Sequence, residues 1–204
     1  MKKYRDILRL IGAILCFWIY LPHILIFLLV RKSKRIYMES DLNILKTQLS
    51  INISTSLGLL LYFLHNNRYY RSVFYHRIGI IPSLLIGWLR PGDRYFSISK
   101  TTKIGYSFWF AHPYGTIINA ESIGNNFKCI HLTTIGDNGG KRPIIGNNVN
   151  LGANVTIVGD VHIGDNVTIG AGSVVVNDIP SHSIAVGVPA RVVKTISISD
   201  DESV

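Results

Sequence analysis

Two histidines attract attention first, because imidazole is the side chain that exchanges a proton near neutral pH. His112 is followed by Pro-Tyr-Gly, and His131 comes three hexads and one further residue later. A positioned imidazole can take the proton from a hydroxyl as its oxygen attacks an electrophile. Two neighbouring histidines could instead hold a metal ion, or simply be polar surface residues. The fold that positions them decides between these uses.

The elements around these histidines are predicted by a six-residue internal repeat. From Ile145 five hexads run without a break: IGNNVN, LGANVT, IVGDVH, IGDNVT and IGAGSV. The first position is always Ile or Leu, the second is Gly in four hexads, and the fifth is Val in four. A helix cannot use this spacing, because apolar residues six apart drift around a 3.6-residue turn. Short strands joined by tight turns can, with the aliphatic residue pointing inward and Gly or Asn at the corners.

Stacked coils of such strands predict a parallel β-helix with about 4.8 Å between neighbouring coils. The same register extends back to inward positions at Ile98, Ile104 and Phe110, then restarts at Ile117, Ile123, Cys129 and Ile135. A one-residue insertion between Thr116 and Ile117 accounts for the shift. In this register His112 and His131 are both third residues of their hexads. We therefore expect them to stack in adjacent coils within about 5 Å.

The first 35 residues predict a membrane-embedded segment with basic flanks. Leu10–Val30 carries no formal charge, and as one helix it would be about 32 Å long, close to the ~30 Å hydrocarbon core of a bilayer. A cleavable signal peptide is disfavoured, because the run is long and basic residues follow it. Pro22 invites a kink, so a hairpin that enters and leaves one leaflet is an alternative to a span. The flanking cations fit that hairpin; they are Lys2, Lys3, Arg5, Arg9, Arg31, Lys32, Lys34 and Arg35.

Residues 36–94 predict two to four helices that lie on a bilayer, because Arg is mixed with Tyr and Phe in NNRYYRSVFYHRIG. A soluble helical cap is the alternative. Pro91–Gly92 breaks this pattern, so we expect the β-helix over 95–195 and a polar tail over 196–204. The predicted fold class is therefore mainly β, with an N-terminal helical, membrane-associated region.

The net charge of +9 is unevenly distributed. Residues 1–94 hold 14 Lys and Arg against 4 Asp and Glu, whereas residues 95–204 hold 7 against 8. The C-terminal half lacks the basic face that nucleic-acid binding requires, so we expect no nucleic-acid partner. The basic half suits the surface of an anionic membrane lipid.

Residues 95–195 resemble the hexapeptide-repeat acyltransferases, which are left-handed parallel β-helices, and within them the serine acetyltransferase-like group. The resemblance rests on the hexads, on FAHPYGTIIN, on the break GDNGGKRP and on the closing run VVVNDIPSHSIAVGVPARVV. It implies a homotrimer with an active site at each subunit interface, and acetyl-CoA as acyl donor in the groove between neighbouring β-helices. Gly136–Pro143 is similar to the loop that protrudes over that groove.

The resemblance also implies roles for single residues. His112 matches the catalytic histidine, a general base toward the acceptor hydroxyl, while His131 either tunes it, touches the acceptor or fills an outward polar position. Small residues that would let the pantetheine arm of CoA approach the backbone are Gly152, Ala153, Gly170 and Ala171. Cations available for the CoA phosphates, or alternatively solvated surface charges, are Lys141, Arg142, Arg191 and Lys194.

Departures from the serine enzymes bear on the acceptor. Ser97 stands where those enzymes carry the aspartate that pairs with the catalytic histidine, Asp93 is too far off in register to replace it, and GGKRPIIG lacks their second histidine. Together with the membrane-seeking N-terminus, this favours acetylation of a sugar hydroxyl in surface polysaccharide or lipid-linked glycan synthesis. Serine O-acetyltransferase of cysteine biosynthesis is the alternative. Because acetyl-CoA is cytoplasmic, we expect the β-helix on the cytoplasmic side of the membrane.

Two other classes of hexapeptide protein fit the sequence less well. A zinc hydrase of the γ-carbonic anhydrase type needs a close histidine pair such as H-x4-H, which the sequence lacks, so we expect no metal. A non-catalytic scaffold is disfavoured by the HPYG segment and the GVPAR ending.

Overall fold

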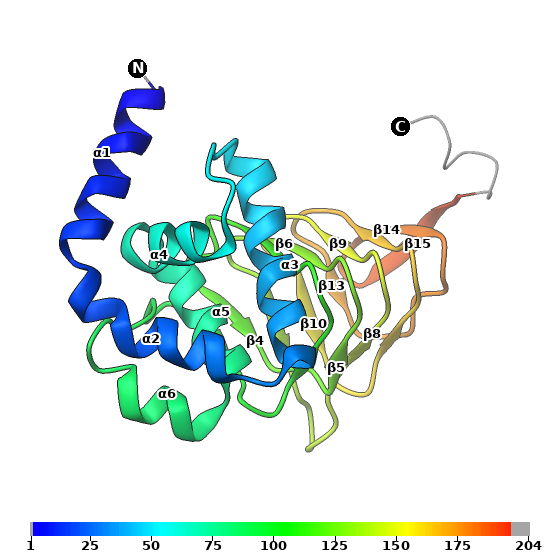
Figure 1. Cartoon of the computed structure of the whole chain (residues 1–204). Helices are drawn as coiled ribbons and strands as arrows, with labels where there is room; N and C mark the ends of the chain where they lie inside the picture. Colours follow the sequence, from blue (N-terminus) through cyan, green and yellow to red (C-terminus); the bar gives the residue numbers. More distant parts are fainter. Residues whose placement is uncertain (1, 197–204) are drawn as a thin grey trace. The chain divides into compact units, whose positions relative to one another are not determined.

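The computed structural model of the chain describes residues 2–196, without the side chains of residues 2, 3 and 5 (Figure 1). The chain forms two compact units, Met1–Arg94 and Tyr95–Val204, and each is considered by itself. Apart from residue 196, the polar tail expected over 196–204 lies outside the described residues.

The first unit is helical throughout its described part (Figure 1). Its helices are α1 (Lys2–Leu15), α2 (Phe17–Leu29), α3 (Lys32–Leu49), α4 (Ser56–Asn66), α5 (Arg68–Ile78) and α6 (Ile80–Ile86). Helix α4 forms the centre, since each residue from Leu59 to Leu64 is buried and α1, α2, α3 and α5 all contact it. The Thr55 hydroxyl begins α4 by accepting a hydrogen bond from the Gly58 N–H.

The uncharged segment Leu10–Val30 is not the single helix considered from the sequence. Asp6–Leu15 and Phe17–Leu29 meet at a bend of 87°, which falls at Cys16 and not at Pro22, a residue inside α2. The bend lets both helices pack on α4, with Ala13 and Tyr20 completely buried. In residues 2–196 no helix by itself has the length and composition of a membrane span, whereas this bent pair has them jointly.

Two buried polar contacts tie the outer helices of this unit together. The Arg77 guanidinium donates to both Asp41 carboxylate oxygens, at 2.8 and 3.1 Å, and so joins α5 to α3. The His23 Nε2 lies 2.8 Å from the Tyr75 hydroxyl and joins α2 to α5. Burying a charge or polar group costs free energy unless it is paired, so these contacts favour this arrangement of the helices.

The second unit confirms the expected parallel β-helix, built from three sheets. The first sheet contains β1 (Phe96–Ile98), β4 (Thr116–Ile118), β7 (Thr134–Gly136), β10 (Thr156–Val158) and β13 (Val174–Val175). The second contains β2 (Lys103–Ile104), β5 (Ser122–Ile123), β8 (Ile144–Ile145) and β11 (His162–Ile163). The third contains β3 (Trp109–Ala111), β6 (Lys128–Ile130), β9 (Asn150–Leu151), β12 (Thr168–Ile169), β14 (Ser183–Gly187) and β15 (Ala190–Thr195). All pairings within the sheets are parallel except β14 with β15.

The register of the C-terminal coils is three complete hexads, as the pairing of Ile145 with Ile163 and of Leu151 with Ile169 shows. The earlier coils depart from this register, and the prediction that Ile117 points inward is wrong. Ile117 is 51% exposed, whereas Ile118 is completely buried.

The cause of this difference lies in two corners of the β-helix. Phe110 pairs with Cys129, one position more than three hexads away, but Ile118 pairs with Ile135, one position fewer. The corner between β3 and β4 therefore holds two extra residues. The corner between β4 and β5 is one residue shorter than the equivalent corner of the first coil, because Ile98 pairs with Ile118 whereas Ile104 pairs with Ile123. The two changes together give the net single insertion inferred from the sequence.

Glycine is required at one corner column because the backbones of adjacent coils nearly touch. A Cβ at Gly146 would lie 2.8 Å from the Gly164 carbonyl carbon and 2.5 Å from Asp165 Oδ1. A neighbouring column carries asparagines with left-handed backbone, and their amides bond from coil to coil, Asn126 to Asn148 at 2.8 Å and Asn148 to Asn166 at 2.7 Å. These corner contacts hold the strands of successive coils in register.

Candidate active site

His112 occupies the expanded corner between β3 and β4. It follows Ala111, the last residue of β3, its side chain is exposed, and its φ is +47°. Its carbonyl accepts a hydrogen bond from the Tyr114 N–H at 2.6 Å, which closes a three-residue turn around Pro113. Left-handed backbone is uncommon for residues other than glycine, but it recurs at corners of this β-helix such as Asn148 and Asn166. The fold thus presents this imidazole to solvent on a tightly constrained turn.

His131 lies in the next coil, directly after β6. The ladder pairs Ala111 with Ile130, so His112 and His131 each follow a paired residue. Beyond that point the pairing of the two coils changes register, because the Leu132 N–H donates to the Tyr114 carbonyl at 2.9 Å. The pairing of β3 with β6 puts the histidines in adjacent coils, while their separation of about 5 Å stays a prediction.

The four small residues predicted to approach CoA lie at the C-terminal ends of two strands of the third sheet. Gly152 and Ala153 follow β9, Gly170 and Ala171 follow β12, and the Gly172 N–H donates to the Ala153 carbonyl at 2.9 Å. A Cβ at Gly152 would lie 2.6 Å from the Ala171 nitrogen. This row of strand ends continues to the earlier coil, because the Asn154 N–H donates to the His131 carbonyl at 3.0 Å. The structure therefore aligns these residues with His131.

Two of the four predicted cations also belong to the third sheet. Arg191 and Lys194 are exposed on β15, where they pair with Val186 and Ile184 of β14. Within residues 2–196 neither forms an ion pair with a carboxylate. In the described part of the chain their charge is thus not neutralised, as binding of an anionic ligand would require.

The other two cations lie elsewhere and are already paired. Lys141 and Arg142 belong to the loop between β7 and β8. Lys141 donates to Asp160, and this hydrogen bond raises the pKa of the Lys141 ammonium. Arg142 pairs with Glu121 and donates to the Thr101 hydroxyl at 2.8 Å. Within one chain this loop is at a different corner from His112, so the structure does not bring these two cations to the histidine.

Neither position considered for an acidic partner supplies a free carboxylate near His112. Ser97 is exposed in the middle of β1 and pairs with Ile117. Asp93 belongs to the helical unit, where its buried carboxylate lies 2.9 Å from Arg68 Nε.

An aromatic pair beside His112 was missed in the sequence. The rings of Tyr95 and Tyr114 are 5.0 Å apart, and both side chains are exposed. Tyr114 is two residues after His112, so the HPYG segment contained part of the signal. Tyr95 could not be found in the same way, because its position beside Tyr114 depends on the register of the first coil.

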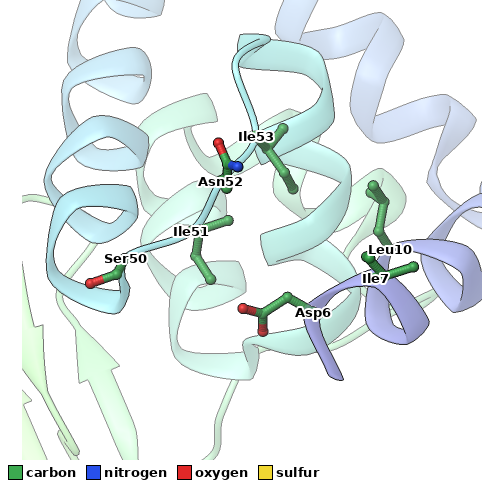
Figure 2. Close-up of a pocket in the computed structure, with 7 residues that line it drawn as sticks. All are labelled: Asp6, Ile7, Leu10, Ser50, Ile51, Asn52 and Ile53. Carbon is green, nitrogen blue, oxygen red and sulfur yellow. The ribbon is translucent and has the colours of Figure 1, made fainter. Parts of the chain in front are cut away.

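A cavity of about 390 Å³ lies in the helical unit and contains none of the predicted site residues. Figure 2 shows its lining, Asp6, Ile7 and Leu10 from α1 and Ser50–Ile53 from the segment after α3. No group of three or more His, Cys, Asp or Glu side chains suited to a metal ion occurs in the described part of the chain.

The repeat region and its sequence relatives agree with this architecture. Residues 142–177 match the family described as bacterial transferase hexapeptide (six repeats). The chain is 45% identical over 101 residues to WcaB of Escherichia coli K12, named as a candidate colanic acid biosynthesis acetyltransferase, covering 48% of this chain and 62% of that protein. It is 36% identical over 128 residues to a serine acetyltransferase of Synechococcus elongatus, covering 59% and 51%. The matches thus span less than two thirds of either relative.

Solved structures show the same fold. A Neisseria gonorrhoeae serine acetyltransferase superposes with a TM-score of 0.65 and 26% identity, over 85% of this chain and 71% of that one. A soybean serine acetyltransferase complexed with serine gives 0.63 and 29%, over 80% and 70%. These likenesses confirm the resemblance to hexapeptide-repeat acyltransferases of the serine acetyltransferase-like group.

Proposed function

We propose that this protein is an O-acetyltransferase that moves the acetyl group of acetyl-CoA to a hydroxyl of a sugar, with His112 as general base. One observation carries the proposal: the strand ends of the third sheet bear the exposed His112, the stacked small residues of the next coils and, beside β14, Arg191. In this order His112 would face the acceptor hydroxyl, the small residues would contact the flexible thioester arm of the donor, and the cation at the end of the row would bind the phosphates.

In this proposal the chain contributes a general base and contacts to the donor. Bound acetyl-CoA supplies an activated thioester carbonyl. His112 takes the hydroxyl proton while the acceptor oxygen forms the new C–O bond. The C–S bond to CoA then breaks, and the proton passes from His112 to the CoA sulfur, which leaves as the thiol. Gly152, Ala153, Gly170 and Ala171 allow the donor to lie against the backbone, and Arg191 and Lys194 bind its phosphates. We assign Lys141 and Arg142 the same role only where Asp160 and Glu121 release them.

A sugar acceptor is favoured over serine by the residues beside His112. The exposed Tyr95–Tyr114 pair offers aromatic surface with polar hydroxyl tips, which suits a ring that has apolar faces and a polar rim. Ser97 leaves no carboxylate where the serine enzymes hold one. The relative named for colanic acid biosynthesis supports the same interpretation. Serine acetylation is the second candidate, supported by the serine acetyltransferase structures, one of them in complex with serine.

We further infer that the enzyme works as a homotrimer, with each site completed by a neighbouring subunit, and that the helical unit brings it to the cytoplasmic face of a membrane, where lipid-linked glycan is found. His131 then either contacts the acceptor or orients His112.

The test is His112→Ala in the full-length protein, with acetylation of a polysaccharide or lipid-linked glycan and of free serine both measured. We expect acetyl transfer to the glycan to fall at least ~100-fold, because the general base is lost, while acetyl-CoA binding is unchanged. His162→Ala, another exposed histidine but on the second sheet, is the matched control and should keep full activity. A His112→Ala protein that retains most activity would remove His112 from catalysis. Efficient serine acetylation without glycan acetylation would restore the serine enzyme.

A further inference from the structure

Helix α2 is apolar on two opposite sides. Tyr20, His23 and Phe27 are buried against the helical unit. Trp18 and Leu29 are 79% and 82% exposed. At 100° per residue they project on the side opposite Tyr20, His23 and Phe27, with the exposed Leu25 in the same stripe. The outer side of α2 therefore presents a stripe of large apolar side chains that nothing in the described chain covers.

Helix α6 continues this exposed surface. It contacts α2 and lies beside it in Figure 1. Leu84 and Leu85 are 73% and 68% exposed, and Trp88, just beyond the helix, is 75% exposed. Ile86, on the opposite side, is buried. We call the exposed side chains of Trp18, Leu25, Leu29, Leu84, Leu85 and Trp88 the α2–α6 face. A soluble monomer rarely leaves an apolar surface of this kind uncovered.

The charges of the helical unit complement an anionic partner. Residues 1–94 contain only four carboxylates, and each has a partner: Asp41 with Arg77, Asp93 with Arg68, Glu39 with Arg35, and Asp6 as acceptor from the Tyr62 hydroxyl. By contrast, Arg31, Lys32 and Lys34 are exposed immediately after α2. These exposed cations therefore adjoin the α2–α6 face at the C-terminal end of α2.

Two arginines without a carboxylate partner in the described residues lie on the buried side of α2. The Arg90 guanidinium lies over the Tyr20 ring at 5.6 Å, and its Nε is buried without a hydrogen-bond partner. Arg71 donates to the carbonyls of Leu64 and Pro91. No carboxylate in residues 2–196 pairs with either arginine. Burial and the charge of Arg90 lower the pKa of Arg71. Because Tyr20 is on the side of α2 away from Trp18 and Leu29, Arg90 does not belong to the α2–α6 face.

We propose that the α2–α6 face is a membrane-docking surface that inserts into one leaflet of an anionic bilayer, with Trp18 and Trp88 in contact with lipid and the exposed cations after α2 against lipid phosphates. Apolar insertion and attraction to anionic headgroups together are what holds an interfacial helix on a bilayer. The inference deepens the membrane association proposed above, and it is tested by lipid binding without turnover, so its failure leaves acetyl transfer untouched.

The experiment compares the full-length protein with Leu84→Asp/Leu85→Asp in flotation with vesicles of phosphatidylcholine alone or mixed with phosphatidylglycerol. We expect the wild-type protein to bind the mixed vesicles at least ~10-fold better than the neutral ones, and the double variant to lose at least ~10-fold of that binding. Val192→Asp/Val193→Asp places the same charges on exposed positions of β15 and should bind like the wild type. Because Leu84 and Leu85 are exposed, circular dichroism should show both variants folded.

Three results would overturn the proposal. The first is equal vesicle binding by the wild-type protein and the Leu84→Asp/Leu85→Asp variant. The second is a lipid-free assembly that this variant dissociates in light scattering, because the face would then be covered by a second copy. The third is cleavage of the N-terminal segment by protease inside sealed vesicles, because the segment would then cross the bilayer.

Discussion

At the scale of single residues, His23 shows how the helical unit depends on protonation. It is completely buried, and the hydrogen of its neighbour Tyr75 goes to the Arg90 carbonyl at 2.7 Å. His23 therefore donates through Nε2 to the Tyr75 oxygen. Burial, and next the nearby charge of Arg71, lower the pKa of His23 to about 4.

This depressed pKa predicts a loss of stability in mild acid. The unfolded chain, with a histidine pKa near 6.5, binds more protons than the folded chain between pH 6.5 and about 4. The contribution of neutral His23 is thus fully present above pH 6.5 and is lost toward pH 4, by up to ~3 kcal/mol. Urea unfolding of the full-length protein at several pH values should show this slope, and His23→Phe should flatten it. The same slope in His23→Phe and wild type would contradict the prediction, and His162→Phe, at an exposed site, is the control.

Residue-level prediction from the sequence succeeded where the repeat contains the whole signal, because the hexads mark the inward Leu151, Ile157 and Ile163, and all three are buried. The role of His112, taken from the HPYG segment, stays a prediction. Residue-level prediction failed between Ile117 and Ile118, because two consecutive isoleucines satisfy the inward position equally well. Only the corner lengths decide between them, and a repeat pattern does not specify where extra residues bulge out.

At the scale of elements, the β-helix is held together by close corner contacts, and Gly146 tests this. A Cβ there would overlap Gly164 and Asp165 of the next coil, so Gly146→Ala must push two coils apart. We expect a loss of at least ~2 kcal/mol in unfolding free energy, in the range of overpacking, measured by chemical denaturation. Gly136→Ala is the matched control, since its Cβ would meet only Val158 at 3.8 Å. An unchanged midpoint for Gly146→Ala would show that the corner can yield.

Element boundaries were predictable in the β-helix and less so in the helical unit. The hexads define strand and corner together, because each strand is only two or three residues long in the repeat. Leu10–Val30 contains no comparable local signal for a boundary, because it is apolar on all sides. Its break at Cys16 comes from packing on α4 and not from a helix-breaking residue. Pro22 is accommodated because it removes a single N–H from α2.

At the scale of the whole molecule, one β-helix offers only one wall of the proposed donor groove. We therefore expect the full-length protein in detergent to be a trimer with three equivalent sites. Light scattering combined with an activity assay on the same fractions measures this. An active monomer would count decisively against a groove shared between subunits. The left hand of the β-helix, like the trimer, comes from the resemblance and stays a prediction.

The register of three hexads per coil has a consequence for how the chain can gain or lose length. Deleting one whole coil, residues 146–163, would bring Ile145 into the sequence position of Ile163 and restore each later ladder one step lower, about 4.8 Å along the axis. Deleting one residue inside a strand would turn the inward side chains that follow it outward until a corner restores the register. The corners are more permissive: the one bearing His112 already holds two extra residues, and the turn from β7 to β8 carries a whole loop. Insertions in homologous chains should therefore be found at corners or as whole coils, and new surface chemistry can be added at a corner without disturbing the core.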